Sequence, residues 1–199
     1  MKTKLFNIDA NAKTIKGQAR GYMTAVLYLS PSDISGTELC PVSAVADCVR
    51  DCLGEAGRAG IAAGRATFKA PNGRELPDNA IQRARLRRTF LFLNDRDAFM
   101  RQVVREIELA ARKAARAELT LAVRPNGTSD IRWENIPVER NGATFPHIFA
   151  AFPELQFYDY TKIPNRRVAG IENYHLTFSY SHAPAFAPIV AREIGRAHV

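Results

Sequence analysis

The chain has 199 residues, of which 46% are hydrophobic and 24% are charged. This size and balance predict one folded domain with a substantial core, and they exclude a wholly disordered, collagen-like or mucin-like chain. No run approaches the ~20 apolar residues of a membrane span, and no apolar stretch follows the basic N-terminus. We therefore expect a cytoplasmic protein, in which three cysteines, an odd number, do not form a disulfide framework.

The predicted elements alternate between short apolar strands and helices. After a polar lead-in over residues 1–20, strands are predicted at 22–29, 119–123, 155–160 and 174–180, and helices at 42–55, 78–93, 95–117 and 144–152. Residues 69–77 are rich in turn formers. This alternation predicts a single α/β domain over residues 21–192, with parallel strands in an open sheet or a partial TIM-type barrel.

The longest predicted helix, residues 95–117, has one apolar face. The residues that recur at steps of three and four, and so form its core-facing stripe, are Phe99, Val103, Ile107, Ala110 and Ala114.

The net charge of +8 is concentrated between Arg74 and Arg116, which carry eleven lysines or arginines against six acidic residues. A basic layer of this kind can attract nucleic acid or another phosphate-bearing partner. A solvated helix surface is the favoured alternative, because no aromatic side chains interleave with the arginines.

The last seven residues, Glu193 to Val199, read EIGRAHV. They are the translation of GAG ATC GGA AGA GCA CAC GTC, which contains a common short-read sequencing adapter. We therefore expect a metagenomic reading frame truncated near Arg192, with an artefactual tail over residues 193–199. An ordinary terminal heptapeptide is the alternative.

Cys40, Cys48 and Cys52 lie together in ELCPVSAVADCVRDCL. The last two stand one turn apart on the predicted helix, so their thiols project from one face, and Cys40 can fold back toward them. Three soft ligands and one open coordination position suit a [4Fe–4S] cluster. Zinc is an alternative that lacks a fourth ligand nearby, and buried packing of the thiols is another. The spacing differs from the C-x3-C-x2-C of radical S-adenosylmethionine enzymes.

Polar residues follow the carboxyl ends of the predicted strands, where ligands bind in parallel α/β folds. Asp130 follows the strand at 119–123, Asp159 and Lys162 lie at the end of the next strand, and Ser179 lies in the last. An aspartate and a lysine three residues apart can pair, orient a substrate, or shift each other's pKa for proton transfer. Turn formation is the alternative role for residues such as Asn126.

Several segments together resemble the phage-associated gene product 88 domain family. They include DCVRDCL, NGTSDIRWE, FPELQFYDYTKIPNR and YHLTFSYS, and the resemblance covers roughly residues 15–182, with KAPNGRELPDN at 69–79 as a departure. The resemblance implies a phage or mobile-element protein of the infected bacterial cytoplasm, without an assigned activity, whose members continue beyond this chain. The site positions that it implies are Cys40, Cys48, Cys52, Asn126, Ser129, Asp130, Asp159, Tyr160 and Lys162.

These observations lead to two competing predictions. The first is an iron–sulfur enzyme, radical-S-adenosylmethionine-like in plan, that acts on a small molecule and can use S-adenosylmethionine. The second is a non-enzymatic protein that binds nucleic acid or a host factor through the basic layer at Arg83 to Arg116, with structural cysteines or zinc. In the first, the cluster ligands are Cys40, Cys48 and Cys52, the catalytic residues are Asp130, Asp159 and Lys162, and the substrate-binding residues are Asn126, Ser129, Tyr160 and Ser179.

Overall fold

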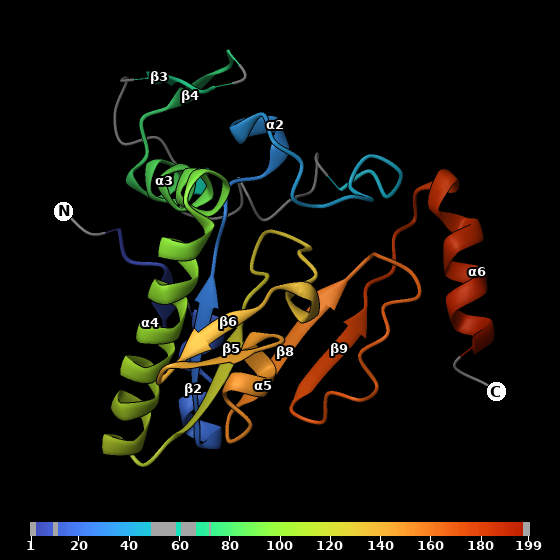
Figure 1. Cartoon of the computed structure of the whole chain (residues 1–199). Helices are drawn as coiled ribbons and strands as arrows, with labels where there is room; N and C mark the ends of the chain where they lie inside the picture. Colours follow the sequence, from blue (N-terminus) through green and yellow to red (C-terminus); the bar gives the residue numbers. More distant parts are fainter. Residues whose placement is uncertain (1–2, 10–11, 49–58, 61–66, 72, 197–199) are drawn as a thin grey trace.

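A five-stranded sheet forms the frame of the molecule, in the strand order β1-β2-β5-β8-β9 (Figure 1). β1 pairs antiparallel with β2, whereas β2, β5, β8 and β9 are mutually parallel and follow chain order across the sheet. The computed structural model describes residues 3–9, 12–48, 59–60, 67–71 and 73–196. The bounds of the five strands are β1 Phe6–Ile8, β2 Tyr22–Leu27, β5 Thr120–Arg124, β8 Gln156–Thr161 and β9 Tyr174–Phe178.

The predicted α/β class with parallel strands is confirmed. Within the part of the chain that the structure describes, the sheet is open, with β1 and β9 at its edges, and these strands do not close the expected TIM-type barrel. The polar lead-in contributes the edge strand β1, whose Phe6 is buried in the core.

One face of the sheet is covered by a long helix, a short helix and a small hairpin, which lie in front of it in Figure 1, whereas the helix over residues 80–94 lies above the sheet in that view. The long α4, Arg96–Arg116, begins at Asp95, whose carboxylate accepts a hydrogen bond from the N–H of Ala98 at 2.9 Å. α3, Ala80–Asn94, begins at Asn79 rather than at the expected Asp78, because the Asn79 side chain accepts the Ile81 N–H. The other covering elements are the hairpin of β6 Val138–Arg140 and β7 Ala143–Phe145, and α5 Ile148–Ala151.

The remaining elements lie around this frame. They are α1 Ala12–Ile15, the 3-10 turn η1 Gln18–Arg20, α2 Ser32–Ser35, the hairpin of β3 Thr67–Lys69 and β4 Glu75–Pro77, the 3-10 turns η3 Trp133–Asn135 and η4 Pro184–Phe186, and α6 Ala187–Arg196.

The core lies between the sheet and these covering elements. All five residues of the stripe predicted on α4 are buried, and they pack in one cluster with the strand residues Ala25, Leu27, Leu121 and Val123. In β8, Phe157 and Asp159 share this covered face, whereas Tyr158 and Tyr160 point to the opposite face, because successive strand residues alternate. This alternation places Asp159 in the interior.

The helix predicted from Val42 to Glu55 is wrong in its described half. Residues 41–48 form turns, because Asp47 adopts a left-handed backbone with φ of 47°, and the N–H of Cys48 reaches back to the Ser43 carbonyl. Residues 49–58, and with them Cys52, lie outside the described residues.

The β6–β7 hairpin was not predicted from the sequence. Its turn is Asn141–Gly142, with φ of 54° and 78°, which is the two-residue Asn-Gly turn that closes hairpins.

Candidate functional site at the carboxyl ends of the strands

A pocket of ≈ 180 Å³ lies at the carboxyl ends of the parallel strands. The segment after β2 crosses above this edge of the sheet, where α2 is labelled in Figure 1, and forms one wall. The loops after β5, β8 and β9 supply the others. The predicted site residues that line this pocket are Cys40, Cys48, Asn126, Ser129, Asp130, Tyr160, Lys162 and Ser179. Sequence positions more than a hundred residues apart therefore meet at one place.

The loop after β5 is pressed against the end of β2 at Gly127. A Cβ atom at this position would lie 2.6 Å from both the Leu27 carbonyl oxygen and the Tyr28 ring, so the close approach requires glycine. The Gly127 N–H donates to the Leu27 carbonyl at 2.8 Å, and the Thr128 hydroxyl donates to the Leu29 carbonyl. These contacts fix the two walls of the pocket relative to one another.

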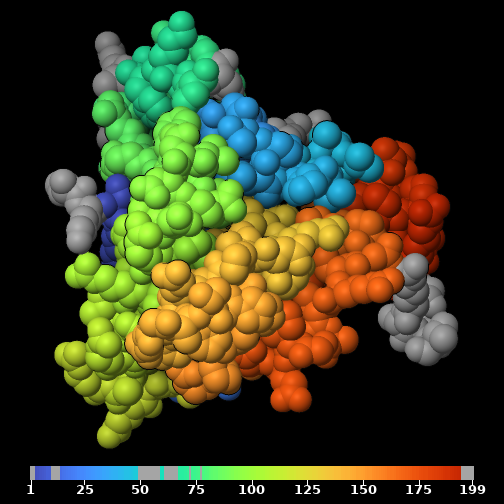
Figure 2. Space-filling view, viewed as in Figure 1, coloured from blue at the N-terminus to red at the C-terminus, as the bar shows by residue number. Residues whose placement is uncertain are grey.

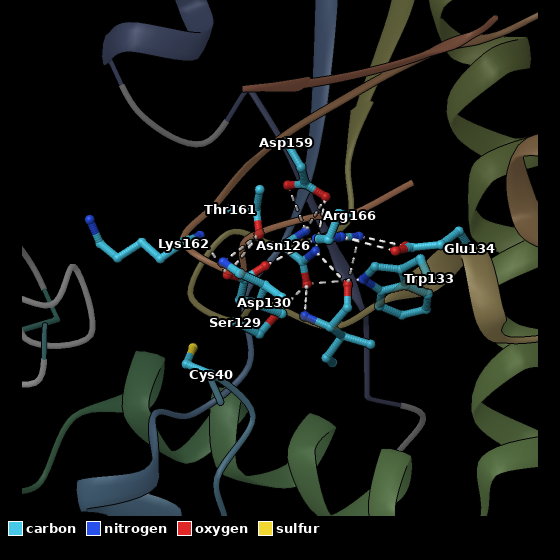
Figure 3. Close-up of polar contacts among 12 residues, drawn as sticks. Cys40, Asn126, Ser129, Asp130, Trp133, Glu134, Asp159, Thr161, Lys162 and Arg166 are labelled. Carbon is cyan, nitrogen blue, oxygen red and sulfur yellow. Dashed lines mark hydrogen bonds and ion pairs between the residues drawn. The ribbon is translucent and has the colours of Figure 1, made fainter. Parts of the chain in front are cut away.

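Asn126 is the centre of the hydrogen-bond network beneath the pocket (Figure 3). Its Oδ1 accepts hydrogen bonds from Ser129 Oγ at 2.9 Å, and from Ile131 N and Trp133 Nε1 at 3.0 Å each. Its Nδ2 donates to the Ile131 carbonyl at 3.0 Å and to Asp159 at 3.1 Å. The Asn126 side chain, which was predicted to bind substrate, therefore forms these hydrogen bonds within the protein. It holds the conformation of the loop after β5.

Asp159, on β8, contacts this loop at Asn126 and is 1% exposed. Its carboxylate accepts hydrogen bonds from the Asn126 N–H at 3.0 Å and from the Tyr174 hydroxyl at 3.4 Å, and it lies 3.7 Å from Arg124 Nε. Burial raises the pKa of Asp159 to about 8, against the opposing effects of the Arg124 charge and the Asn126 N–H. Among the described contacts, Asp159 does not pair with Lys162 as the sequence allowed, because positions an odd number apart along a strand point to opposite faces.

Asp130 connects the loops after β5 and β8. Its carboxylate accepts hydrogen bonds from Thr161 Oγ1 at 3.0 Å and Lys162 N at 2.8 Å, and it pairs with Arg166 at 3.0 Å. Arg166, whose side chain is 1% exposed, also pairs with Glu134. Burial raises the pKa of Asp130, while the Lys162 N–H, the Thr161 hydroxyl and the Arg166 charge oppose this shift. The Asp130 carboxylate therefore braces the fold in a literal sense: it holds the loop after β5 against the loop after β8.

Two cations face the pocket. Lys162 extends away from Asp130 and Asp159 in Figure 3, and its Nζ donates to the Tyr180 carbonyl at 2.7 Å and to Ser179 Oγ at 3.3 Å. The Arg124 guanidinium stands over the Tyr160 ring, 5.0 Å from its centre. Arg124 Nε is buried without a hydrogen-bond partner among the described residues.

The acidic residues that line the pocket are already engaged. Asp130 is held as described above, and Glu38 accepts hydrogen bonds from the Cys40 N–H at 2.6 Å and from Ser43 Oγ at 2.7 Å. Lys162 and Arg124 are the cationic side chains of the described lining.

Two of the three predicted cluster ligands, Cys40 and Cys48, line this same pocket. Cys40 Sγ lies 4.0 Å from the Thr128 carbonyl oxygen. Within the described ranges no group of three histidine, cysteine or acidic side chains is placed to hold a metal ion, and the predicted third ligand, Cys52, is outside those ranges.

The predicted basic layer, Arg83 to Arg116, exposes fewer positive charges to solvent than its sequence suggests, because two of its arginines are buried. Arg85 and Arg88 are each 6% exposed. Arg88 donates to the carbonyl oxygens of Lys4 at 2.7 Å and Tyr28 at 3.3 Å, and burial lowers its pKa to about 10. These two arginines are parts of the fold, whereas the exposed basic residues of this layer are Arg83 and Arg87 on α3 and those at positions 96, 101, 105, 112, 113 and 116 on α4.

A family model described as "Gene product 88" matches residues 3–198. The chain belongs to the gene product 88 family. No curated protein and no solved structure matches it. Among the described residues, no helix of this gene product 88 protein has both the length and the apolar character that a membrane crossing requires.

The two most specific segments of the gene product 88 resemblance build the network under the pocket. NGTSDIRWE contributes Asn126, Ser129, Asp130 and Glu134, and YDYTKIPNR contributes Asp159, Thr161, Lys162 and Arg166. Arg124 and Arg166 were not among the predicted site residues. Two features of the sequence could have identified them: Arg124 lies at the end of a predicted strand, and Arg166 is the last residue of the specific segment YDYTKIPNR.

Proposed function

We propose that this gene product 88 protein is an iron–sulfur enzyme that binds a small anionic molecule in the strand-end pocket. The observation that carries the proposal is that two of the clustered cysteines, Cys40 and Cys48, share one pocket with two cations, Lys162 and Arg124. Cys52, four positions after Cys48, is the third ligand in this proposal.

The donor set suits a cluster better than it suits zinc. Thiolates are the usual ligands of iron–sulfur clusters, whereas a closed zinc site needs a fourth ligand, and the described lining of this pocket contains no histidine. A cluster held by three thiolates supplies single electrons and one open iron position, the combination used in S-adenosylmethionine chemistry.

The chain's own residues bind and orient the anion. Lys162 Nζ, held by Ser179 and Tyr180, presents its charge to the pocket, and the Arg124 guanidinium can form a two-pronged contact with a carboxylate or phosphate. The Asp159 carboxyl group lies 3.7 Å from Arg124 Nε, and the Asp130 carboxylate accepts the backbone N–H of Lys162. Both aspartates are positioning residues in this proposal.

Anaerobic reconstitution with iron and sulfide tests the proposal. We expect the wild-type chain to gain broad sulfur-to-iron charge-transfer absorbance, and the Cys40→Ser, Cys48→Ser, Cys52→Ser variant to gain none. Ser43→Ala, in the same turn segment, is the matched control and should behave as wild type. Retention of zinc in place of iron, or equal absorbance in the triple variant, would overturn the proposal.

A further inference from the structure

We infer that the groove between β1 and α4 docks an acidic, extended segment of a partner protein. The groove encloses ≈ 660 Å³ and shares no lining residue with the strand-end pocket. The N-terminal residues, dark blue, lie beside α4 at the left of the molecule in Figures 1 and 2. The residues that line the groove include Lys4, Phe6, Ile8, Arg101, Arg105, Leu109 and Lys113.

Four exposed cations stand around this groove: Lys4, Arg101, Arg105 and Lys113. None of them has an ion-pair partner among the residues that the structure describes. Four exposed cations against one carboxylate make the groove complementary to a negatively charged partner.

The one acidic residue among the described lining of the groove, Glu106, forms no ion pair with these cations. The Glu106 carboxylate accepts hydrogen bonds from the backbone N–H groups of Leu5 and Phe6, at 2.9 Å each, and from Gln102 Nε2 at 2.7 Å. Glu106 therefore fastens the lead-in to α4, and the groove lining stays net positive, with four cations against this one carboxylate.

The shape of the groove favours a peptide. Its lining residues on α4 run from Ala98 to Lys113, about 22 Å along the axis, which matches about seven residues of extended chain. Leu109, 48% exposed, offers an apolar contact between the cations. Phe6, the one aromatic residue of the lining, is 1% exposed and gives nucleobases no stacking surface, so an acidic peptide with interspersed apolar residues fits better than single-stranded nucleic acid.

The binding of a fluorescein-labelled peptide of alternating aspartate, glutamate and leucine residues, about ten residues long, tests this inference by fluorescence anisotropy. The variant Arg105→Glu, Lys113→Glu should bind at least about tenfold more weakly than wild type. The matched control Arg112→Glu, Arg116→Glu changes the same charge on the same helix outside the groove lining, and it should stay within about twofold of wild type. Circular dichroism of both variants establishes that α4 is retained.

The Leu109→Ser variant separates the peptide from nucleic acid. We expect it to weaken binding of the peptide and to leave binding of a labelled oligothymidine unchanged. Equal loss of peptide binding in the groove and control variants would overturn the inference. Tighter binding of oligothymidine than of the peptide, lost in the groove variant alone, would also overturn it and identify a phosphate-chain site instead.

Discussion

The backbone N–H of Lys162 donates a 2.8 Å hydrogen bond to the Asp130 carboxylate, while the ammonium group of the same lysine turns to the Tyr180 carbonyl, 2.7 Å away. One residue is thus anchored by its backbone to the loop after β5 and by its side chain to the segment after β9. Among the described residues the Lys162 ammonium has no acidic partner, and the lysine links the loops after β5, β8 and β9 at the pocket.

Loss of the Asp130 charge should destabilise the fold. Asp130→Asn leaves Glu134 as the one carboxylate partner of the buried Arg166 among the described residues, and we expect the free energy of unfolding to fall by about 3 kcal/mol in urea titrations. Asp78→Asn breaks the more exposed ion pair with Arg83 and should cost less than about 1 kcal/mol. Similar losses in the two variants would contradict the bracing role of Asp130.

Gly127 should tolerate no side chain. In Gly127→Ala the new Cβ meets the Leu27 carbonyl and the Tyr28 ring, and we expect a loss of about 2 kcal/mol of unfolding free energy. Gly170→Ala is the control, because no atom lies within 4 Å of its Cβ position, and it should be close to neutral. Thermal unfolding of the two variants side by side measures the difference, and a neutral Gly127→Ala would contradict the close approach of the loops.

The raised pKa of Asp159 predicts a pH-dependent stability. Between pH 3.8, its ordinary pKa, and about 8, its pKa in the fold, the folded chain holds a proton that the unfolded chain releases. The contribution of Asp159 to stability is therefore present below this window and is lost as the pH rises through it. Urea unfolding across the window should show a steeper decline for wild type than for Asp159→Asn, and parallel curves would disprove the assignment.

Lys162→Met should remove one of the two anion contacts and leave the fold intact. We expect inorganic phosphate, followed by titration calorimetry, to bind about tenfold more weakly to this variant than to wild type. Lys69→Met, on the exposed strand β3, removes the same charge elsewhere and should leave phosphate binding unchanged. Equal affinities for phosphate in the Lys162 variant and wild type would exclude an anion contact by this lysine.

Local patterns in the sequence predicted the frame of the molecule. The apolar runs around Val123 and Phe157 indicated buried strands, and the spacing from Phe99 to Ala114 identified the buried face of α4, because both depend on short-range periodicity. The turn segment at Asp47 escaped prediction, since a left-handed residue ended a pattern that is otherwise typical of a helix.

The roles of the site residues depended on contacts between distant segments. Asn126 looked like a turn residue or a ligand contact, but its hydrogen bond to Asp159 joins positions 33 residues apart. Arg166 meets Asp130 across 36 residues. Their positions at strand ends predicted that these side chains would lie close together. Those positions did not show which of the side chains would bond to one another and which would face the pocket.

The measurement that tests the central claim most directly is the iron and acid-labile sulfide content of anaerobically purified protein. The account predicts about four of each per chain in the wild type and in Ser43→Ala, and neither in the Cys40→Ser, Cys48→Ser, Cys52→Ser variant. A wild-type protein without iron and sulfide, or a triple variant that retains both, would contradict the assignment of an iron–sulfur site to this pocket.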